Sequence, residues 1–353
     1  SDWQAQIRDA ASRGRVLGIR GGHSKAFYGR ATAEPDGWID VRPYAGILSH
    51  EPSELVVTVR AGTLLVELQT VLAQHGQMLA FEPPHFGGEA TVGGCVAAGL
   101  AGPRRMAAGS VRDFVLGVML LDGRGTYLSF GGQVMKNVAG YDVSRLMAGS
   151  LGSLGVLLDV SLKVLPLPRA EQTLCLELGE GEALMRCAQW GGRPLPVSAT
   201  LWHSGQLWVR LSGNAAAVDS AVAQLGGECL APEQAAALWQ SVREHRHEFF
   251  TAQPATPLWR LSLPSVAPPV ALEGAQLIEW GGALRWLRSD VSADAVRAAV
   301  AAVGGHACLF RGGDRSGAVF HPLAPAMLTL QQRVKQAFDP FRVFNPGRIY
   351  PEI

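Results

Sequence analysis

The sequence is poor in cysteine, and its cysteines are not grouped. The 353 residues include five cysteines, an odd number, and no Cys-x-x-Cys pair. Iron–sulfur clusters are held by grouped cysteine thiolates, and disulfide frameworks use even numbers of cysteines. The spacing therefore argues against an iron–sulfur cluster held by this chain and favours a reducing compartment.

An excess of charge of one sign and long apolar runs are also missing. The formal net charge is +1, from 31 Lys and Arg against 30 Asp and Glu, and the basic residues are spread along the chain. No uncharged apolar run approaches the roughly 18 residues of a membrane span, and no basic region followed by an apolar stretch opens the sequence. We therefore expect a soluble chain that binds neither nucleic acid nor an anionic membrane surface.

Glycine, in contrast, is in excess. The chain has 42 glycines, about 12 % of its residues against an average usage of roughly 7 %, and most of them lie before residue 167. Because the composition is 48 % hydrophobic and 17 % charged, disorder is excluded as the main state, and the length favours two domains. No three-residue period accompanies the glycines, so their role must be local.

The first 166 residues alternate predicted strands and helices with glycine-rich turns. We predict helices over 3–12 and 64–74, the second closed by Gly76, and strands over 16–20, 55–60, 114–121, 125–130 and 154–164. The turn Asp122-Gly123-Arg124 joins the strands 114–121 and 125–130 into a hairpin. The stretch 86–109 is too apolar for a flexible linker and too rich in glycine for a stable helix interior.

The second half has a different pattern and contains seven of the nine tryptophans, which we interpret as core rather than as an aromatic interface. We predict strands over 199–211, 258–263 and 283–287 between helices over 215–225, 233–244 and 293–303. This order favours an antiparallel sheet with helices on one face. A helix over 325–338, opened by Pro325, and a turn at Asn345-Pro346-Gly347 follow.

Three groups of glycine-rich motifs could contact a ligand through their backbone. Arg20-Gly21-Gly22-His23-Ser24 follows a predicted strand, where its amides could approach a pyrophosphate or could form only a tight turn. The second group is Thr91-Val92-Gly93-Gly94 with Gly109-Ser110-Val111-Arg112-Asp113. The third is Lys136-Asn137-Val138-Ala139-Gly140-Tyr141-Asp142 with Gly149-Ser150-Leu151-Gly152-Ser153-Leu154-Gly155-Val156. Such segments suit an extended ligand or, alternatively, tight packing of one segment on another.

In this order, the motifs resemble the FAD-binding domain of the vanillyl-alcohol-oxidase type. Within that superfamily the chain is similar to the FAD-binding subunits of bacterial glycolate oxidases. The stretches that carry this closer similarity are Ser24-Lys25-Ala26-Phe27, Phe81-Glu82-Pro83-Pro84-His85, Gly99-Leu100-Ala101-Gly102-Pro103-Arg104-Arg105, Trp280-Gly281-Gly282-Ala283-Leu284-Arg285-Trp286-Leu287 and Phe344-Asn345-Pro346-Gly347-Arg348. The resemblance implies an α+β fold: a two-lobed FAD-binding domain over 1–166, a smaller antiparallel-sheet cap domain over 167–324, and a C-terminal helix and turn over 325–353 that return to the FAD domain.

The resemblance implies FAD as the cofactor and assigns its contacts. The loop around the pyrophosphate would be formed by Arg20, Gly21, Gly22, His23, Ser24 and Lys25. The flavin and its ribityl chain would be lined by Pro84, Thr91, Gly93 and Gly94, with Gly109, Ser110 and Asp113 continuing this wall. The adenosine end would lie near Gly149, Ser150, Gly155 and Val156, although Leu151 stands where many relatives have a Glu. His23 could attach FAD covalently, as a histidine in a similar turn does in some members, or could simply line the loop.

The resemblance also implies a reaction and partners. FAD would accept a hydride from a 2-hydroxy acid such as glycolate, giving glyoxylate, and would pass electrons to an iron–sulfur subunit. A larger flavin subunit would complete a cytoplasmic complex, and any association with the inner membrane would run through these partners. That larger subunit carries a Gly-Asp-Gly-Asn-x-His motif and further histidines that hold a metal. Here the nearest fragment, Gly312-Gly313-Asp314-Arg315, lacks both Asn and His, so we expect no metal site.

A catalytic base is not evident in the sequence. His85 is a candidate for acid–base contact, and Arg104 and Arg105 are candidates for binding the substrate carboxylate. The alternatives are a loop histidine with its own hydrogen bonds and arginines that lie at the surface or neutralise phosphate. His245 and His247 are two positions apart, which disfavours a shared metal on one helix face. A non-catalytic assembly or electron-relay subunit, and a self-sufficient FAD oxidoreductase for another 2-hydroxy acid, remain as alternatives.

Overall fold

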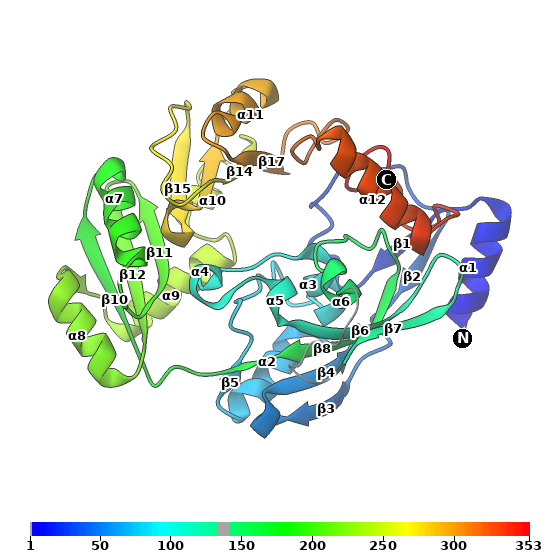
Figure 1. Ribbon diagram of the computed structural model, residues 1–353, viewed down its shortest axis with the longest axis horizontal. Coiled ribbons are helices and arrows are strands. Elements are labelled where there is room, and N and C mark those ends of the chain that lie inside the picture. Colours follow the sequence, from blue (N-terminus) through cyan, green and yellow to red (C-terminus); the bar gives the residue numbers. More distant parts are fainter. Residues whose placement is uncertain (1, 133–141) are drawn as a thin grey trace. The chain divides into compact units, whose positions relative to one another are not determined.

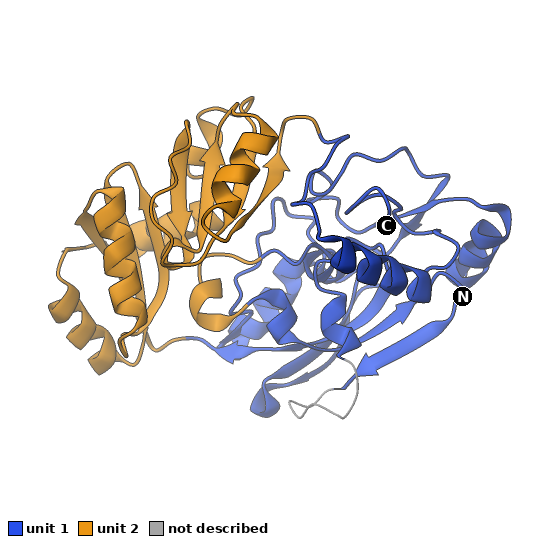
Figure 2. Cartoon of the chain, turned by 45° about the horizontal axis from the view of Figure 1, so that its top comes forward, with its two compact units in different colours: residues 1–100, 110–167, 315–353 blue, residues 101–109, 168–314 orange. Residues whose placement is uncertain are grey.

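The computed structural model describes residues 2–132 and 142–353, which form two compact units (Figure 2). Unit 1 comprises Ser1–Leu100, Ser110–Leu167 and Arg315–Ile353, and unit 2 comprises Ala101–Gly109 and Pro168–Asp314. The predicted motif Lys136-Asn137-Val138-Ala139-Gly140-Tyr141 lies outside the described residues.

Apart from Leu167, which belongs to unit 1, the units differ from the predicted ranges at two places. Residues 101–109 belong to unit 2, where Trp280 Nε1 donates to the carbonyl of Gly102 at 3.1 Å. Residues 315–324 belong to unit 1, where the amide of Ala31 donates to the carbonyl of Arg315 at 2.9 Å. Both differences arise from contacts between residues that are distant in the sequence.

Unit 1 combines a five-stranded antiparallel sheet with a small parallel sheet (Figure 1). Its strands are β1 (Leu17–Arg20), β2 (Gly37–Asp40), β3 (Ile47–Glu51), β4 (Val56–Arg60), β5 (Gln77–Met78), β6 (Val115–Leu121), β7 (Tyr127–Gly131), β8 (Val156–Lys163) and β9 (Leu165–Pro166). Its helices are α1 (Asp2–Arg13), α2 (Leu65–Gln74), α3 (Val92–Ala98), α5 (Val111–Phe114), α6 (Val143–Leu146) and α12 (Pro325–Phe338), with a 3-10 turn at Pro52–Glu54. The large sheet has the order β3-β4-β8-β6-β7, and β1 pairs with β2 in parallel.

The stretch 86–109, predicted to be too rich in glycine for a stable helix interior, contains the short helix α3. Gly93 and Gly94 lie in the first turn of this helix, and the Thr91 hydroxyl caps it by accepting from the amide of Gly94 at 3.2 Å. Gly99 ends it with a φ of +65°, a conformation that glycine adopts without strain. The glycines therefore sit at the ends of a short helix, where their conformational cost is small, and the interior is Cys, Val and Ala.

The predicted hairpin at 122–124 is confirmed. β6 and β7 pair in antiparallel register, with Leu121 opposite Tyr127. Asp122 fixes the turn because its Oδ1 accepts from the amides of Arg124 and Thr126, at 2.9 and 2.8 Å.

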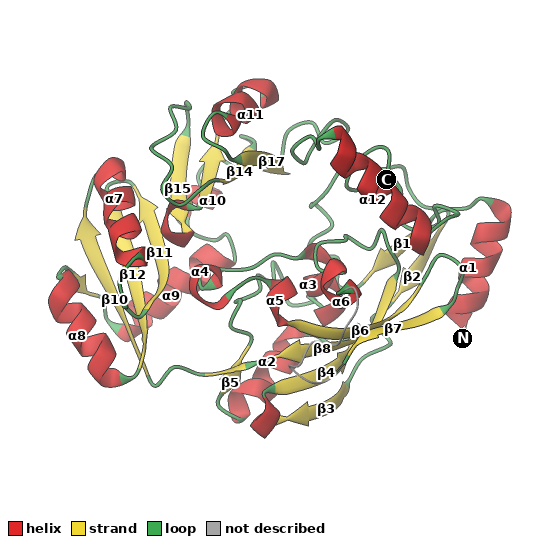
Figure 3. Ribbon diagram, viewed as in Figure 1, coloured by secondary structure: helices red, strands yellow, loops and turns green. Residues whose placement is uncertain are grey.

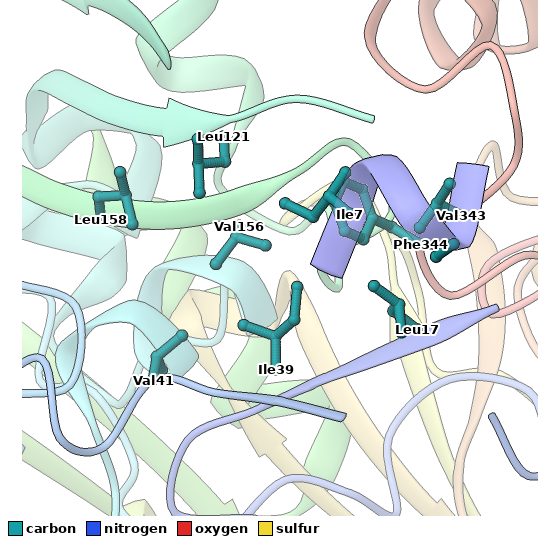
Figure 4. Packing of buried hydrophobic residues seen from close by; sticks show 10 residues of the cluster. Ile7, Leu17, Ile39, Val41, Leu121, Val156, Leu158, Val343 and Phe344 are labelled. Atoms are coloured by element: carbon teal, nitrogen blue, oxygen red, sulfur yellow. The ribbon is translucent and has the colours of Figure 1, made fainter. Parts of the chain in front are cut away.

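A buried apolar cluster ties the two ends of unit 1 together (Figure 4). Ile7 of α1, Leu17 of β1 and Ile39 of β2 pack with Val343 and Phe344 near the C-terminus. The amide of Leu17 also donates to the carbonyl of Val343 at 2.8 Å. This core fixes β1, so that the Gly-Gly turn after β1 starts from a rigid support.

A buried ion pair holds the chain after α12. Lys335 Nζ lies 2.7 Å from Asp339 Oδ2 and donates to the carbonyls of Ser153 and Phe344, each at 2.7 Å. The Asp339 carboxylate in turn accepts from the amides of Val343 and Phe344, at 2.9 and 2.8 Å. Both side chains are almost fully buried, and the hydrogen bonds on every side offset the cost of removing the charges from water. Burial lowers the pKa of Lys335, and the charge of Asp339 opposes that shift.

Unit 2 is built on one eight-stranded antiparallel sheet (Figure 3). Its strands, in the order β13-β10-β12-β11-β15-β16-β14-β17, are β10 (Ala170–Glu177), β11 (Val197–His203), β12 (Gln206–Gly213), β13 (Glu228–Cys229), β14 (Leu258–Ser262), β15 (Ala275–Glu279), β16 (Leu284–Arg288) and β17 (His306–Arg311). Its helices are α4 (Arg105–Ala108), α7 (Glu180–Gly191), α8 (Ala215–Leu225), α9 (Pro232–Arg243), α10 (Glu248–Thr251) and α11 (Ala293–Ala301), with a 3-10 turn at Trp280–Gly282. The single strand predicted over 199–211 is wrong, since Ser204 and Gly205 turn it into the hairpin β11-β12.

Helices cover both faces of this sheet rather than the one face predicted. Leu174 of β10 packs in an apolar cluster with residues of α7 and α8. Thr173, its neighbour on the strand, accepts at Oγ1 from Trp239 Nε1 of α9 at 2.9 Å. Because neighbouring residues of a strand point to opposite faces, α9 lies across the sheet from α7 and α8.

The interpretation of the unit 2 tryptophans as core is confirmed. Five of the seven are buried and two are half-buried. The buried ones are Trp190, Trp239, Trp259, Trp280 and Trp286.

Candidate functional site

A cavity of about 470 Å³ lies within unit 1, where β1 ends. Its wall brings together Ala61 and four segments distant in the sequence: residues 16–41, 91–98, 150–157 and 345–348. Eleven residues predicted to contact FAD line it, namely Arg20, Gly21, Gly22, His23, Ser24, Lys25, Thr91, Gly93, Gly94, Ser150 and Gly155. The volume is within the range of small-molecule and cofactor sites.

The turn after β1 presents a row of open backbone donors. The amides of Gly21, Gly22, His23 and Ser24, which we call the amide loop, donate to no acceptor in the described part of the chain. His23 has a φ of +54°, a left-handed conformation, and its side chain is exposed. Successive amides in such a turn form a concave site for an anion, so the loop fits a phosphate group.

Glycine is required in the amide loop because a second segment approaches it closely. A Cβ on Gly22 would lie 1.4 Å from the carbonyl oxygen of Glu89, and one on Gly21 would lie 2.3 Å from Thr91 Oγ1. A Cβ on Gly93 would meet that of Ala61 at 2.7 Å. These glycines thus serve the packing of one segment on another, and that packing sets the position of the amides.

The cavity wall carries more positive than negative side chains. Arg20, Lys25 and Arg348 line it, against Glu34 and Asp36. Arg20 Nε lies 3.3 Å from Oδ2 of Asp40, a residue that does not line the cavity. Hydrogen bonding to Arg42 lowers the pKa of Asp40 to about 2, so this carboxylate remains charged beside Arg20.

Three arginines bind backbone carbonyls where the C-terminal turn meets the residues after the amide loop. Arg348 donates to the carbonyls of Ala26, Tyr28 and Arg30, and Arg30 donates to those of Ser316, Gly317 and Gly347. Arg315 donates to the carbonyl of Gly29. Burial lowers the pKa of Arg348, and the positive charge of Arg315 lowers it further. The C-terminal turn therefore fixes the shape of the cavity wall directly after Lys25.

Five unit 1 residues predicted to contact FAD do not line this cavity: Pro84, Ser110, Asp113, Gly149 and Val156. A sixth predicted contact, Gly109, belongs to unit 2. Val156 belongs to the buried core, and the amide of Gly149 donates to the carbonyl of Val96 at 3.0 Å. Ser110 donates through its amide and its hydroxyl to Asp113 Oδ2, each at 2.8 Å, and thereby caps α5. Partial burial would raise the pKa of Asp113, but these hydrogen bonds and the nearby arginines lower it.

Of the three candidates for catalysis, His85 belongs to unit 1 and lies outside the cavity lining, and Arg104 and Arg105 belong to unit 2. His85 Nε2 is 2.7 Å from Gln69 Oε1, and its carbonyl accepts from Lys25 Nζ at 3.2 Å. Arg104, in unit 2, donates to Glu171 Oε2 at 2.7 Å and to Ser212 Oγ at 3.0 Å. Arg105 stacks on the Trp280 ring at 4.5 Å. Within unit 2, Arg104 already binds a carboxylate of the chain itself.

The two histidines near 245 do not form a site either. They follow α9 rather than lie within a helix, and His245 stacks on Phe250 with ring centroids 4.0 Å apart. Burial lowers the pKa of His245 well below its usual value, so its ring is neutral. The described side chains include no group of three or more His, Cys, Asp or Glu residues arranged to hold a metal ion. Across the described ranges, every helix is too short or too polar to span a bilayer.

Sequence reasoning missed several cavity residues: Gly18, Trp38, Asn345 and Arg348 among them. The motif Asn345-Pro346-Gly347-Arg348 signalled a turn, but nothing local indicated that it meets residues 26–30. Nothing in the local sequence marked Trp38 as a cavity residue, because an aromatic residue in a short strand is also typical of the hydrophobic core.

Comparisons with known proteins agree with this geometry. Residues 1–131 match the family described as FAD binding domain. The chain is 49 % identical over 348 residues to the glycolate oxidase subunit GlcE of Escherichia coli (strain K12), which covers 99 % of this chain and 96 % of that protein. The glycolate oxidase subunit GlcD of Bacillus subtilis (strain 168) is 32 % identical over 130 residues, 36 % of this chain and 27 % of that protein. A solved structure of alkyldihydroxyacetonephosphate synthase has the same fold, with a TM-score of 0.66 and 13 % identity over 96 % of this chain and 74 % of that one.

Proposed function

We propose that this chain, which belongs to the family of the glycolate oxidase subunit GlcE and carries an FAD-binding domain, has the same role as that subunit. It would be the FAD-binding subunit of a complex that oxidises glycolate to glyoxylate. The observation that carries the proposal is the amide loop, whose four open amides line the unit 1 cavity between Arg20 and Lys25. These amides would hold the FAD pyrophosphate, and Ser150 and Gly155 would line the adenosine end. Unit 1 would thus be the FAD-binding domain and unit 2 the cap domain.

Bound FAD would supply a hydride acceptor for the alcohol carbon of a 2-hydroxy acid. The chain's own part is to hold the dinucleotide and shield its phosphates from water through the amide loop and the cations around it. His85 is hydrogen-bonded to Gln69 outside the cavity lining, and within unit 2 Arg104 is already bound to Glu171. This observation favours a second candidate function, an assembly or electron-relay subunit that depends on partner subunits for the oxidation step.

The partners in this proposal are a larger flavin subunit and an iron–sulfur subunit that receives the electrons. The relative GlcE, which is 49 % identical over 99 % of this chain, is named as a subunit, and this supports a multi-subunit complex. The complex would lie in the cytoplasm, and any association with the membrane would be made through those partners. This location fits the five ungrouped cysteines and the absence of a membrane-spanning helix among the described residues.

Anaerobic addition of glycolate to the isolated, flavin-loaded chain tests where the oxidation occurs. We expect the flavin band near roughly 450 nm to persist, because His85, the candidate for acid–base contact, lies outside the cavity lining, while dithionite as a control bleaches it. Added to a partner preparation that lacks this chain, the chain should restore glycolate oxidation. Bleaching by glycolate alone would instead identify a self-sufficient oxidoreductase, and a partner preparation that is fully active without the chain would contradict the proposed function.

A further inference from the structure

Trp38 of β2 is a large aromatic side chain left open at the cavity wall. Its side chain lines the cavity, and 38 % of its surface is exposed, whereas its neighbour Ile39 is fully buried. An indole of this exposure in a concave site offers a planar apolar surface to a ligand.

The Trp38 ring is held in place by packing against β1. Gly18 of β1 lies opposite Trp38 in the parallel pair. A Cβ on Gly18 would fall 2.5 and 2.6 Å from Cζ3 and Cε3 of the indole, and 2.9 Å from Cγ of Pro35. The six-membered ring therefore rests against the bare backbone of β1, and a ring held in this way loses little conformational entropy when a ligand stacks on it.

Trp38 also lies next to the amide loop. Its ring centroid is 5.4 Å from that of His23, and the Arg20 guanidinium lies 5.7 Å from the indole centroid. An anion held by the amides of residues 21–24 would therefore place any planar ring attached to it within reach of the indole. The ligand that fits both features is a heteroaromatic ring joined to a pyrophosphate.

We propose that Trp38 is the stacking platform for the adenine ring of the bound dinucleotide, an inference that rests on the proposed function. FAD has a planar ring at each end, and residues expected at both ends line this cavity: Ser150 and Gly155 at the adenosine end, and Thr91, Gly93 and Gly94 along the flavin. A single ribose joins adenine to the pyrophosphate, whereas a longer ribityl chain joins the flavin, so we assign the indole that lies beside the amide loop to adenine. Stacking on an aromatic side chain suits adenine, because it needs no particular hydrogen-bond pattern.

The test compares Trp38→Ala and Trp38→Phe with the unchanged chain, with Tyr127→Ala as a matched control. Tyr127 is an aromatic residue of unit 1, 47 % exposed and outside the cavity lining. FAD, ADP and FMN are titrated separately against each variant. We expect Trp38→Ala to raise the Kd of FAD and of ADP about tenfold and to leave the Kd of FMN unchanged. Trp38→Phe should restore most of the affinity, and Tyr127→Ala should change none of the three.

Tryptophan fluorescence gives a second readout. ADP should quench the emission of the unchanged chain, and the quenching should vanish in Trp38→Phe although that variant still binds ADP. If FAD binds the unchanged chain but Trp38→Ala binds FAD and ADP as tightly, the stacking proposal fails while the proposed function stands. A selective loss of FMN affinity would assign Trp38 to the flavin ring and overturn the adenine assignment. If FAD binds none of the proteins, the proposed function itself fails.

Discussion

Gly22→Ala is expected to weaken FAD binding by a factor of about one hundred or more. The new Cβ would lie 1.4 Å from the carbonyl oxygen of Glu89, and neither group is a flexible side-chain end that can move aside. The amide loop must therefore shift away from the segment before α3. Hydrogen bonds to a charged group contribute about 1.5–3 kcal/mol each, so losing two of the four amide donors to the pyrophosphate accounts for the factor. Flavin fluorescence titration measures the change.

Gly88→Ala is the matched control for this prediction. Gly88 lies next to Glu89, its φ is not in the left-handed region, and no atom lies within 4 Å of the position that its Cβ would take. This variant makes the same chemical change close to the same segment, and its FAD affinity should stay within about twofold of the unchanged chain. Thermal melting of both variants separates loss of binding from loss of folding. Equal FAD affinity of folded Gly22→Ala and Gly88→Ala would show that the amide loop does not hold the cofactor.

Lys335→Met is expected to give the largest loss of stability. The substitution leaves the Asp339 carboxylate buried without its cation and removes the bonds to the carbonyls of Ser153 and Phe344. Breaking a buried ion pair in this way costs about 3–5 kcal/mol. For a unit of this size, such a loss lowers the melting temperature by on the order of 10 °C, which calorimetry measures.

Arg333→Met on the same helix is the control. Arg333 is exposed, so its replacement removes the same charge without opening a buried pair, and the melting temperature should move by no more than about 2 °C. Equal shifts for the two variants would mean that the buried pair does not hold the end of the chain. Lys335 also holds the carbonyl of Phe344, and Asn345 is the next residue in the chain. Lys335→Met should therefore also loosen the cavity wall that Asn345 and Arg348 help to form.

Local sequence patterns predicted the elements that carry a strong period and clear ends. The helices α8 and α12 run over the predicted residues 215–225 and 325–338, because Asn214 caps the first and Pro325 opens the second. The turn at Ser204 and Gly205 was missed, although both residues have a positive φ and a Ser-Gly pair between apolar residues is a turn signal. The helix α3 was missed because its glycines lie at its ends, and composition alone does not reveal position within a helix.

The cavity could be predicted in part, because its glycine motifs follow a strand in a recognisable order. What could not be predicted comes from contacts between distant residues. The packing of Trp38 against β1 depends on Gly18 lying opposite it. The place of Arg348 in the cavity wall depends on its hydrogen bonds to carbonyls of residues 26–30. Each residue is ordinary in its local sequence, and only the parallel pair and the returning C-terminus bring it to the cavity.

Equilibrium dialysis of the purified chain against FAD tests the central claim most directly, namely that unit 1 holds FAD through its amide loop. The account predicts saturable binding of one FAD per chain, competed by ADP and weakened in Gly22→Ala but not in Gly88→Ala. A chain that is purified without flavin and retains no FAD at any concentration in the dialysis, while it remains folded by its melting profile, would contradict it.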